Sequence, residues 1–204
     1  MLNPNFVYLA SAIASVGVVL YGVEMFRWKA HPNRVSWLLW GLLPVTTWLA
    51  SISEGAGLAA FFALATGLSA LTIFGLSFFV AQAYWKTSRL DLICGACSVL
   101  ALVLWGLTRN GNLAIVLLIF ADGLAALPTI VKAFRNPESE YALAYVLSAV
   151  SAVITLLTIS NWTFADSAFP IYILFVNAAI VLAIVGPRSR AKAPDVATEA
   201  TLEE

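Results

Sequence analysis

Seven stretches of mostly apolar residues follow one another along the chain, and this pattern restricts the fold more than any other feature of the sequence. They cover residues 6–26, 35–53, 58–84, 90–108, 113–134, 141–160 and 168–186. A helix that rises about 1.5 Å per residue needs roughly 20 residues to cross about 30 Å of hydrocarbon, which is close to the length of each stretch. Because 61% of the residues are hydrophobic and only 11% are charged, water cannot be the main solvent. The sequence therefore predicts an all-α integral membrane protein with seven transmembrane helices in the lipid bilayer.

Basic residues are concentrated in alternate connections between these stretches. Ten of the eleven Lys and Arg residues lie there, namely Arg27, Lys29, Arg34, Lys86, Arg89, Lys132, Arg135, Arg188, Arg190 and Lys192, whereas Arg109 lies in the other set. The positive-inside rule then predicts an N-terminus outside the cell or in a lumen and a cytosolic C-terminus. No Lys or Arg precedes Arg27, so the first stretch lacks the basic region of a secretory signal and is expected to remain as a span. We place the protein in the plasma membrane or a bacterial inner membrane.

The spacing of the stretches predicts an internal repeat. Pro32 and Pro137 each lie in a short basic connection on the same side of the membrane. Two three-helix units in the same orientation require one additional helix that reverses the chain between them. We therefore expect a 3+1+3 plan of parallel repeats. It comprises a first three-helix bundle at 1–84, an inverting linker helix at 85–111, a second three-helix bundle at 112–186 and a disordered cytosolic tail at 187–204.

The segment Leu127-Pro128-Thr129-Ile130-Val131-Lys132-Ala133-Phe134-Arg135-Asn136 resembles the signature of the PQ-loop and SWEET transporter superfamily. In that family, Pro-Gln near the end of the fifth helix precedes a short basic loop. Here Thr129 replaces the Gln, and the corresponding place in the first helix reads Val23-Glu24. The resemblance implies two parallel three-helix bundles and an inverting fourth helix. It also implies transport of a small polar solute, such as a sugar, an amino acid or a vitamin, through a central cavity by alternating access.

Two prolines fall inside predicted spans. Pro44 and Pro128 each remove one helical hydrogen bond and loosen the preceding turn. The family resemblance implies that they act as hinges, whereas a static kink that improves packing is the alternative.

Asp122 is the acidic residue nearest the middle of any predicted span. A carboxylate there costs at least about 2.5 kcal/mol unless it faces a polar interior or becomes protonated. We therefore expect Asp122 to be the proton-coupling or cation site, with an interhelical hydrogen bond as the alternative. Glu24, near the end of the first span, is a second candidate for proton coupling, although a salt bridge with Arg27 three residues later is the favoured role.

Several polar or aromatic residues are candidates for solute binding. Asn177 and Thr72 are predicted at nearly the same depth as Asp122, with Ser69 one turn from Thr72. The resemblance adds weight to Asn177, because sugar-transporting members use Asn on this helix. Trp48 shares a helix face with Trp40 and Pro44 and could stack on a solute, while packing or lipid contact is the alternative. Thr155 belongs to a weakly polar stripe with Ser148 and Ser151, which could equally permit close helix approach.

Other classes of function have no support in the sequence. It contains no catalytic Ser/His/Asp set, Gly-rich phosphate loop or metal cluster, so we expect neither an enzyme nor a cofactor. Cys94 and Cys97 lie inside one predicted span with no second pair, and the net charge of zero gives no nucleic-acid surface. The alternative to a transporter is a receptor, chaperone or assembly module that kept the seven-helix fold. Self-association is left open.

Overall fold

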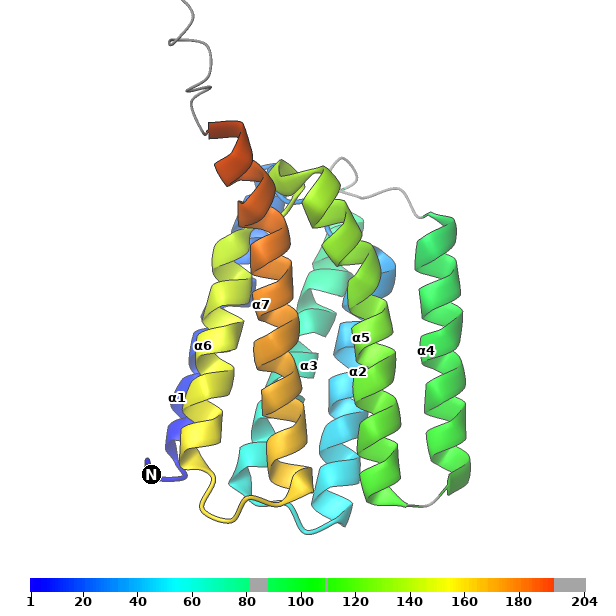
Figure 1. Cartoon of the computed structure of the whole chain (residues 1–204), viewed down its shortest axis with the longest axis vertical. Coiled ribbons are helices and arrows are strands. Elements are labelled where there is room, and N and C mark those ends of the chain that lie inside the picture. The colour runs from blue at the N-terminus through cyan, green and yellow to red at the C-terminus, as the bar shows by residue number, and fades with distance from the viewer. Residues whose placement is uncertain (81–87, 109, 193–204) are drawn as a thin grey trace, which may run out of the picture.

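The computed structural model describes residues 1–80, 88–108 and 110–192, which form seven α-helices with short connections (Figure 1). The helices are α1 (Phe6–Phe26), α2 (Arg34–Ser53), α3 (Phe61–Leu76), α4 (Arg89–Thr108), α5 (Gly111–Arg135), α6 (Ala142–Thr158) and α7 (Phe164–Lys192). Short 3-10 turns flank them: η1 (Leu58–Ala60), η2 (Ser77–Phe79) and η4 (Pro137–Ser139). Lys86, Arg109 and the tail at 193–204, on which part of the predicted topology rests, lie outside the described residues. The prediction of an all-helical protein is confirmed for the residues described.

The helices have the length and composition of membrane spans. Within the residues that the structure describes, five segments are long and apolar enough to cross a bilayer, namely α1, α2, the run from Leu58 to Phe79, α5 and the part of α7 up to Gly186. Helix α6 is apolar but has 17 residues. The outer faces expose large apolar side chains, such as Val19 at 64%, Phe175 at 69% and Leu182 at 71%. Contiguous exposed apolar surface of this kind requires a nonpolar environment, so these helices indicate an integral membrane protein.

Local signals determine where several helices begin and end. Asn33 caps α2 by accepting hydrogen bonds from the backbone N–H groups of Val35 and Ser36, at 3.0 and 3.3 Å. Thr163 and Asp166 form a reciprocal cap at the start of α7. Gly55 follows α2 with a φ of +78°, a left-handed conformation that glycine adopts without steric cost.

Two predicted boundaries need correction. Helix α7 was expected at 168–186, but it begins at Phe164 and continues to Lys192, so the predicted tail at 187–204 begins at least six residues too early. Hydropathy marks the part of a helix that lies in lipid, whereas caps and backbone hydrogen bonds determine its full length. Helix α3 ends at Leu76, and η2 follows it, inside the stretch predicted at 58–84. The limits predicted for the first span, 6–26, agree with α1.

Six helices form a closed ring, and α4 lies outside it. Around the ring, α1 packs on α3, α3 on α2, α2 on α5, α5 on α7, α7 on α6, and α6 on α1. Helix α4 packs on α5 and more weakly on α2, at the edge of the molecule (Figure 1). A 2.5 Å hydrogen bond from Asn33 Nδ2 to Asp91 Oδ1 ties α4 to the start of α2. The ring therefore encloses an axis that six helices share.

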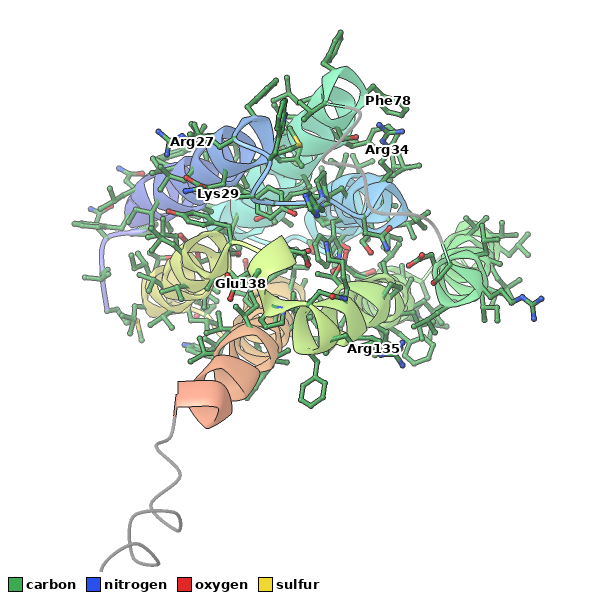
Figure 2. The ribbon with its side chains drawn as sticks, turned by 90° about the horizontal axis from the view of Figure 1, so that it is seen from above. Arg27, Lys29, Arg34, Phe78, Arg135 and Glu138 are labelled. Carbon is green, nitrogen blue, oxygen red and sulfur yellow. The ribbon has the colours of Figure 1, made fainter. Side chains whose placement is uncertain are left out.

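The two ends of the ring differ in charge. We call the end with the α1–α2 and α5–α6 connections the basic end; Figure 2 looks down on this end and shows Arg27, Lys29, Arg34 and Arg135 spread around it. Arg34 joins α2 to the end of α3 through Ser77 and stacks on Phe78, with its guanidinium carbon 4.4 Å from the ring centre. We call the other end the opposite end. Its described residues include Glu54 and Asp166 but no Lys or Arg.

Helices α2 and α3 approach closely because each has a glycine at their crossing. A Cβ atom built on Gly67 would lie 2.7 Å from the carbonyl oxygen of Gly41 and 3.0 Å from the backbone nitrogen of Val45. These are backbone atoms, so they cannot move aside by a change of rotamer. In contrast, a Cβ on Gly75, in the same helix, would meet no atom within 4 Å.

We predict that Gly67→Ala lowers the free energy of unfolding by about 1–3 kcal/mol, because the added methyl group forces α2 and α3 apart. Gly75→Ala is the matched control and should leave stability unchanged or raise it by up to about 1 kcal/mol, since alanine restricts the unfolded chain. Thermal unfolding of the purified protein in detergent measures both. Equal stability of the two variants would contradict the close approach of these helices.

Candidate functional site

A small cavity lies on the axis of the ring and has a volume of about 70 Å³. All six ring helices contribute side chains to it, and none of the described side chains of α4 does. The lining residues are Val18, Trp37, Trp40, Pro44, Thr66, Ala70, Asp122, Ala144, Tyr145, Ser148, Ile173, Val176, Asn177 and Ile180. Ligand sites for drug-sized molecules usually enclose about 300–1,000 Å³, so this cavity as it stands holds a few water molecules or a very small solute.

Among the described residues that line the cavity, Asp122 is the one acidic residue. Its side chain is 3% exposed, and its Oδ2 accepts a 2.6 Å hydrogen bond from the hydroxyl of Tyr172 on α7. Its Oδ1 has no hydrogen-bond partner among the described residues. A buried carboxylate oxygen without a partner costs free energy, so this atom marks a place where a proton, a cation or a donor group can bind.

Asn177 and Thr66 add polar groups to the cavity wall. The Asn177 side chain is 7% exposed and donates one N–H from Nδ2 to the carbonyl oxygen of Ile173, at 2.9 Å on the same helix. The Thr66 hydroxyl donates to the carbonyl oxygen of Phe62 at 2.8 Å. Both side chains therefore satisfy a donor within their own helix and keep acceptor capacity toward the cavity.

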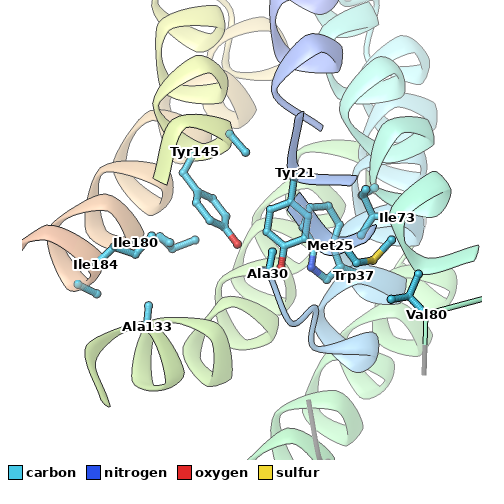
Figure 3. Packing of buried hydrophobic residues seen from close by; sticks show 13 residues of the cluster. Tyr21, Met25, Ala30, Trp37, Ile73, Val80, Ala133, Tyr145, Ile180 and Ile184 are labelled. Atoms are coloured by element: carbon cyan, nitrogen blue, oxygen red, sulfur yellow. The ribbon is translucent and has the colours of Figure 1, made fainter. Parts of the chain in front are cut away.

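Aromatic rings enclose the cavity on the side nearer the basic end. Trp37 and Trp40 meet edge to face with centroids 5.5 Å apart, and Trp40 and Tyr145 do so at 6.5 Å. Tyr21 packs on Trp37 at 4.8 Å and extends this cluster toward α1 (Figure 3). Sequence reasoning concentrated on Trp48 and did not identify Trp37 or Tyr145. The relevant signal was the spacing of Trp37, Trp40 and Pro44, which places all three on one face of α2.

The predicted solute-binding residues do not all lie at the cavity. The inward orientation expected of Thr72 is wrong, because its side chain is exposed on the outer surface of α3. Thr66, six residues earlier and so about 240° away around the helix, faces inward instead. Trp48 packs in an apolar cluster with Phe62 and Phe169, nearer the opposite end.

Ser69 and Thr155 also lie away from the cavity. The Ser69 hydroxyl lies 3.1 Å from that of Ser15 and joins α3 to α1. Thr155 is buried and donates to the carbonyl oxygen of Ser151 in its own helix. Neither residue is among those that line the cavity.

A buried ion pair closes the basic end of the ring. Lys132 on α5 pairs with Glu140, which precedes α6, and the two side chains are 1% and 0% exposed. Lys132 also donates to the carbonyl oxygen of His31, and the hydroxyl of Tyr145 donates to Glu140 Oε2 at 2.7 Å. A backbone hydrogen bond of 3.0 Å from His31 to Ser139 joins the α1–α2 and α5–α6 connections directly. Beyond this closure lies an open pocket of about 660 Å³.

Carboxylate–backbone hydrogen bonds close the opposite end. Asp166 Oδ1 at the start of α7 accepts from the N–H of Gly57 at 2.8 Å, and Glu54 Oε1 at the end of α2 accepts from the N–H of Gly111 at 2.9 Å. Each bond joins one of the first three helices, or their connections, to one of the last three. Outside lies a second pocket of about 280 Å³ that includes Gly57 and Asp166 in its wall. Each end of the ring thus has a closure and an outer pocket, and the small cavity lies between the two closures.

The predicted hinge residues both lie inside helices. Pro44 is buried in α2 and lines the cavity, and Pro128 is buried in α5. The hydroxyl of Ser36 on α2 donates at 2.7 Å to the carbonyl oxygen of Ala125, which lies one turn before Pro128. The two proline-containing helices therefore pack on each other and share this polar link.

Glu24 lies away from the cavity, at the basic end. It forms the predicted salt bridge with Arg27 at 2.9 Å, and Lys29 lies 3.7 Å from its other oxygen. The salt-bridge prediction is confirmed. Within the described residues no group of three or more His, Cys, Asp and Glu side chains could hold a metal ion, and the side chains of Cys94 and Cys97 lie outside the described part.

Comparisons of the chain with protein-family models, with characterised proteins and with solved structures gave no match.

We predict that removing only one partner of the ion pair at the basic end destabilises the protein strongly. Lys132→Met leaves Glu140 buried without a cation and should lower the free energy of unfolding by about 3–5 kcal/mol. Lys132→Met/Glu140→Gln removes both charges and should be more stable than the single variant, when both are measured by thermal unfolding in detergent. Arg27→Met is the control, because the Arg27 side chain is 63% exposed and its pair with Glu24 contributes about 0–1 kcal/mol. A double variant as unstable as Lys132→Met alone would contradict this account.

Proposed function

We propose that this protein carries a small polar solute across its membrane by alternating access. The observation that carries the proposal is the cavity on the ring axis, where the buried carboxylate of Asp122 keeps one oxygen without a partner among the described residues. A buried acid without a paired cation is costly in a membrane protein, and such acids typically mark solute, ion or proton pathways. The carboxylate is therefore the proposed coupling site for a proton or cation.

We further propose that the helices form two parallel repeats, α1–α3 and α5–α7, with α4 as the inverting linker. The contacts support this plan, because exchanging α1, α2 and α3 for α5, α6 and α7 maps each contact in the ring onto another. The α1–α3 contact corresponds to α5–α7, α2–α3 to α6–α7, and α1–α6 to α5–α2. A cavity at the interface of two such repeats is the usual position of a transporter's solute site. The distant resemblance to PQ-loop and SWEET proteins agrees with this arrangement.

The two closures are the proposed gates. In alternating access the halves rock about the solute site, so that one end opens while the other stays shut. At each end the bonds that cross between the halves are few and polar. Those described involve His31, Ser139 and Lys132 at the basic end, and Gly57 with Asp166, Glu54 with Gly111 and Leu2 with Leu157 at the opposite end. Pro44 and Pro128 are the proposed hinges, because each lies in a helix of the α2–α5 contact between the halves.

The charge distribution supports a cytosolic basic end, with the N-terminus outside or in a lumen. Glu24 lies in this end and is engaged by Arg27 and Lys29, so the coupling role rests on Asp122. The non-transporting module remains the competing function. A ring interior without polar groups would favour such a module, whereas Asp122 and Asn177 at the cavity favour a carrier.

We predict that Asp122→Asn and Asn177→Ala each lower solute flux in proteoliposomes by at least about tenfold, because each removes a polar group at the solute site. The solute for this assay is selected beforehand by the shift in thermal unfolding that it produces. Glu138→Gln and Asn161→Ala are matched controls, since both residues are exposed and neither lines the cavity. If flux were unchanged in both cavity variants, this cavity would not be the transport site.

We also predict that a disulfide across the basic end stops transport. The backbone hydrogen bond between His31 and Ser139 holds them at a separation suited to a disulfide, so His31→Cys/Ser139→Cys should cross-link in a Cys94→Ser/Cys97→Ser background. Flux should be lost on oxidation and return with a reductant.

The matched control for this cross-link is Ser15→Cys/Ser69→Cys, whose hydroxyls lie 3.1 Å apart between α1 and α3. This pair joins two helices of the same half and should leave flux nearly unchanged. Normal flux through the oxidised His31/Ser139 variant would show that the basic end does not open during transport, and alternating access would be wrong.

A further inference from the structure

The hydrogen bonds already formed at the cavity wall determine what kind of ligand it can accept. The Tyr172 hydroxyl donates to Asp122, the Thr66 hydroxyl donates to Phe62, and Asn177 donates one N–H to Ile173. No described hydrogen bond engages Asp122 Oδ1 or Asn177 Oδ1. The buried Nε1–H of Trp37, which also lines the cavity, is a donor without a described partner. A ligand that completes the two acceptor oxygens has to bring N–H or O–H donors.

The charge at the cavity wall determines which hydrogen-bond-donating ligands bind favourably. No Lys, Arg or His is among the described residues that line the cavity, whereas Asp122 is. The nearest basic residue along α5 is Lys132, ten residues and so about 15 Å away, and Glu140 pairs with it. A ligand carboxylate would find no cation in the wall and would lie close to Asp122, which is unfavourable in a buried site. A cationic ligand would instead neutralise Asp122.

The aromatic side chains in the cavity wall also favour a positively charged ligand. Trp37, Trp40 and Tyr145 line the cavity on the side nearer the basic end. Aromatic rings attract an ammonium group that lies over their faces, and tryptophan does so most strongly. A sugar carries no charge, so it would not neutralise the negative charge of the Asp122 carboxylate.

We infer that the cavity binds a small protonated amine that has no carboxylate. Its N–H groups donate to Asp122 Oδ1 and Asn177 Oδ1, and its carbon chain contacts Val176, Ile180 and the aromatic rings. This inference rests on the proposed function, in that it takes the cavity to be the transport site, and it specifies the class of solute. The volume of about 70 Å³ restricts the closed state to a ligand of a few non-hydrogen atoms.

The test compares three small compounds: ethanolamine, ethylene glycol and glycine. Ethylene glycol replaces the ammonium group of ethanolamine by a hydroxyl, and glycine retains an ammonium but adds a carboxylate. Binding to the purified full chain is measured from the concentration dependence of thermal unfolding, and flux is measured in proteoliposomes. Ethanolamine should bind at least about tenfold more tightly than either other compound, as expected for a charge-assisted hydrogen bond. Asp122→Asn should abolish this preference, and Glu138→Gln should preserve it.

Equal or tighter binding of ethylene glycol or glycine, or binding of none of the three, overturns the amine assignment. Flux of a sugar or an amino acid that depends on Asp122 would leave the carrier standing while the amine assignment falls. Selective binding of ethanolamine without flux supports the amine site and counts against the carrier. If Asp122→Asn does not fold, the preference of the unmodified protein among the three compounds decides.

Discussion

The absence of water from the hydrocarbon core is the constraint on which the rest of this structure depends. It requires every backbone N–H and C=O group to find its partner within the protein, which leaves helices as the solution for these apolar stretches. It also makes each polar side chain expensive unless it turns away from lipid. The described helices meet both conditions, with large apolar side chains on the outside and Asp122, Asn177 and Thr66 on the inner axis.

Polar groups do two different kinds of work in the ring. At its ends they join the first three helices and their connections to the last three, through Lys132 with the His31 backbone and through the carboxylates of Glu54 and Asp166. At its middle they are incompletely satisfied, as the partnerless Oδ1 of Asp122 shows. Satisfied groups stabilise one conformation, whereas an unsatisfied buried group lowers its free energy when a ligand arrives. A ring with paired ends and an incompletely paired centre agrees with the proposed carrier, which would hold a solute at the centre and open at one end.

Prediction from sequence succeeded where the outcome depends on hydropathy or on spacing along a single helix. The limits of α1 and the class of the protein follow from lengths and hydropathy, and the pair between Glu24 and Arg27 follows from helical spacing. Prediction failed where rotation of a helix decides. Thr72 and Thr66 lie on the same apolar helix with little amphipathic contrast, so the sequence offers no signal for which one faces inward. The Lys132–Glu140 pair was missed because its members come together only when the α5–α6 connection folds back on the ring.

By itself the sequence determined that the chain is helical, that it belongs in a membrane, and that a carboxylate lies near the middle of the fifth apolar stretch. These properties depend on local composition and on distances along one helix, and the helical rise of about 1.5 Å per residue determines those distances. Only the tertiary structure decided that six helices enclose a cavity, that α4 stays outside, and that Asp122 meets Tyr172 there. Those properties depend on how each helix is rotated and which neighbour it packs against. The size of the residues at the helix crossings controls both, as the close approach of α2 and α3 at Gly41 and Gly67 shows.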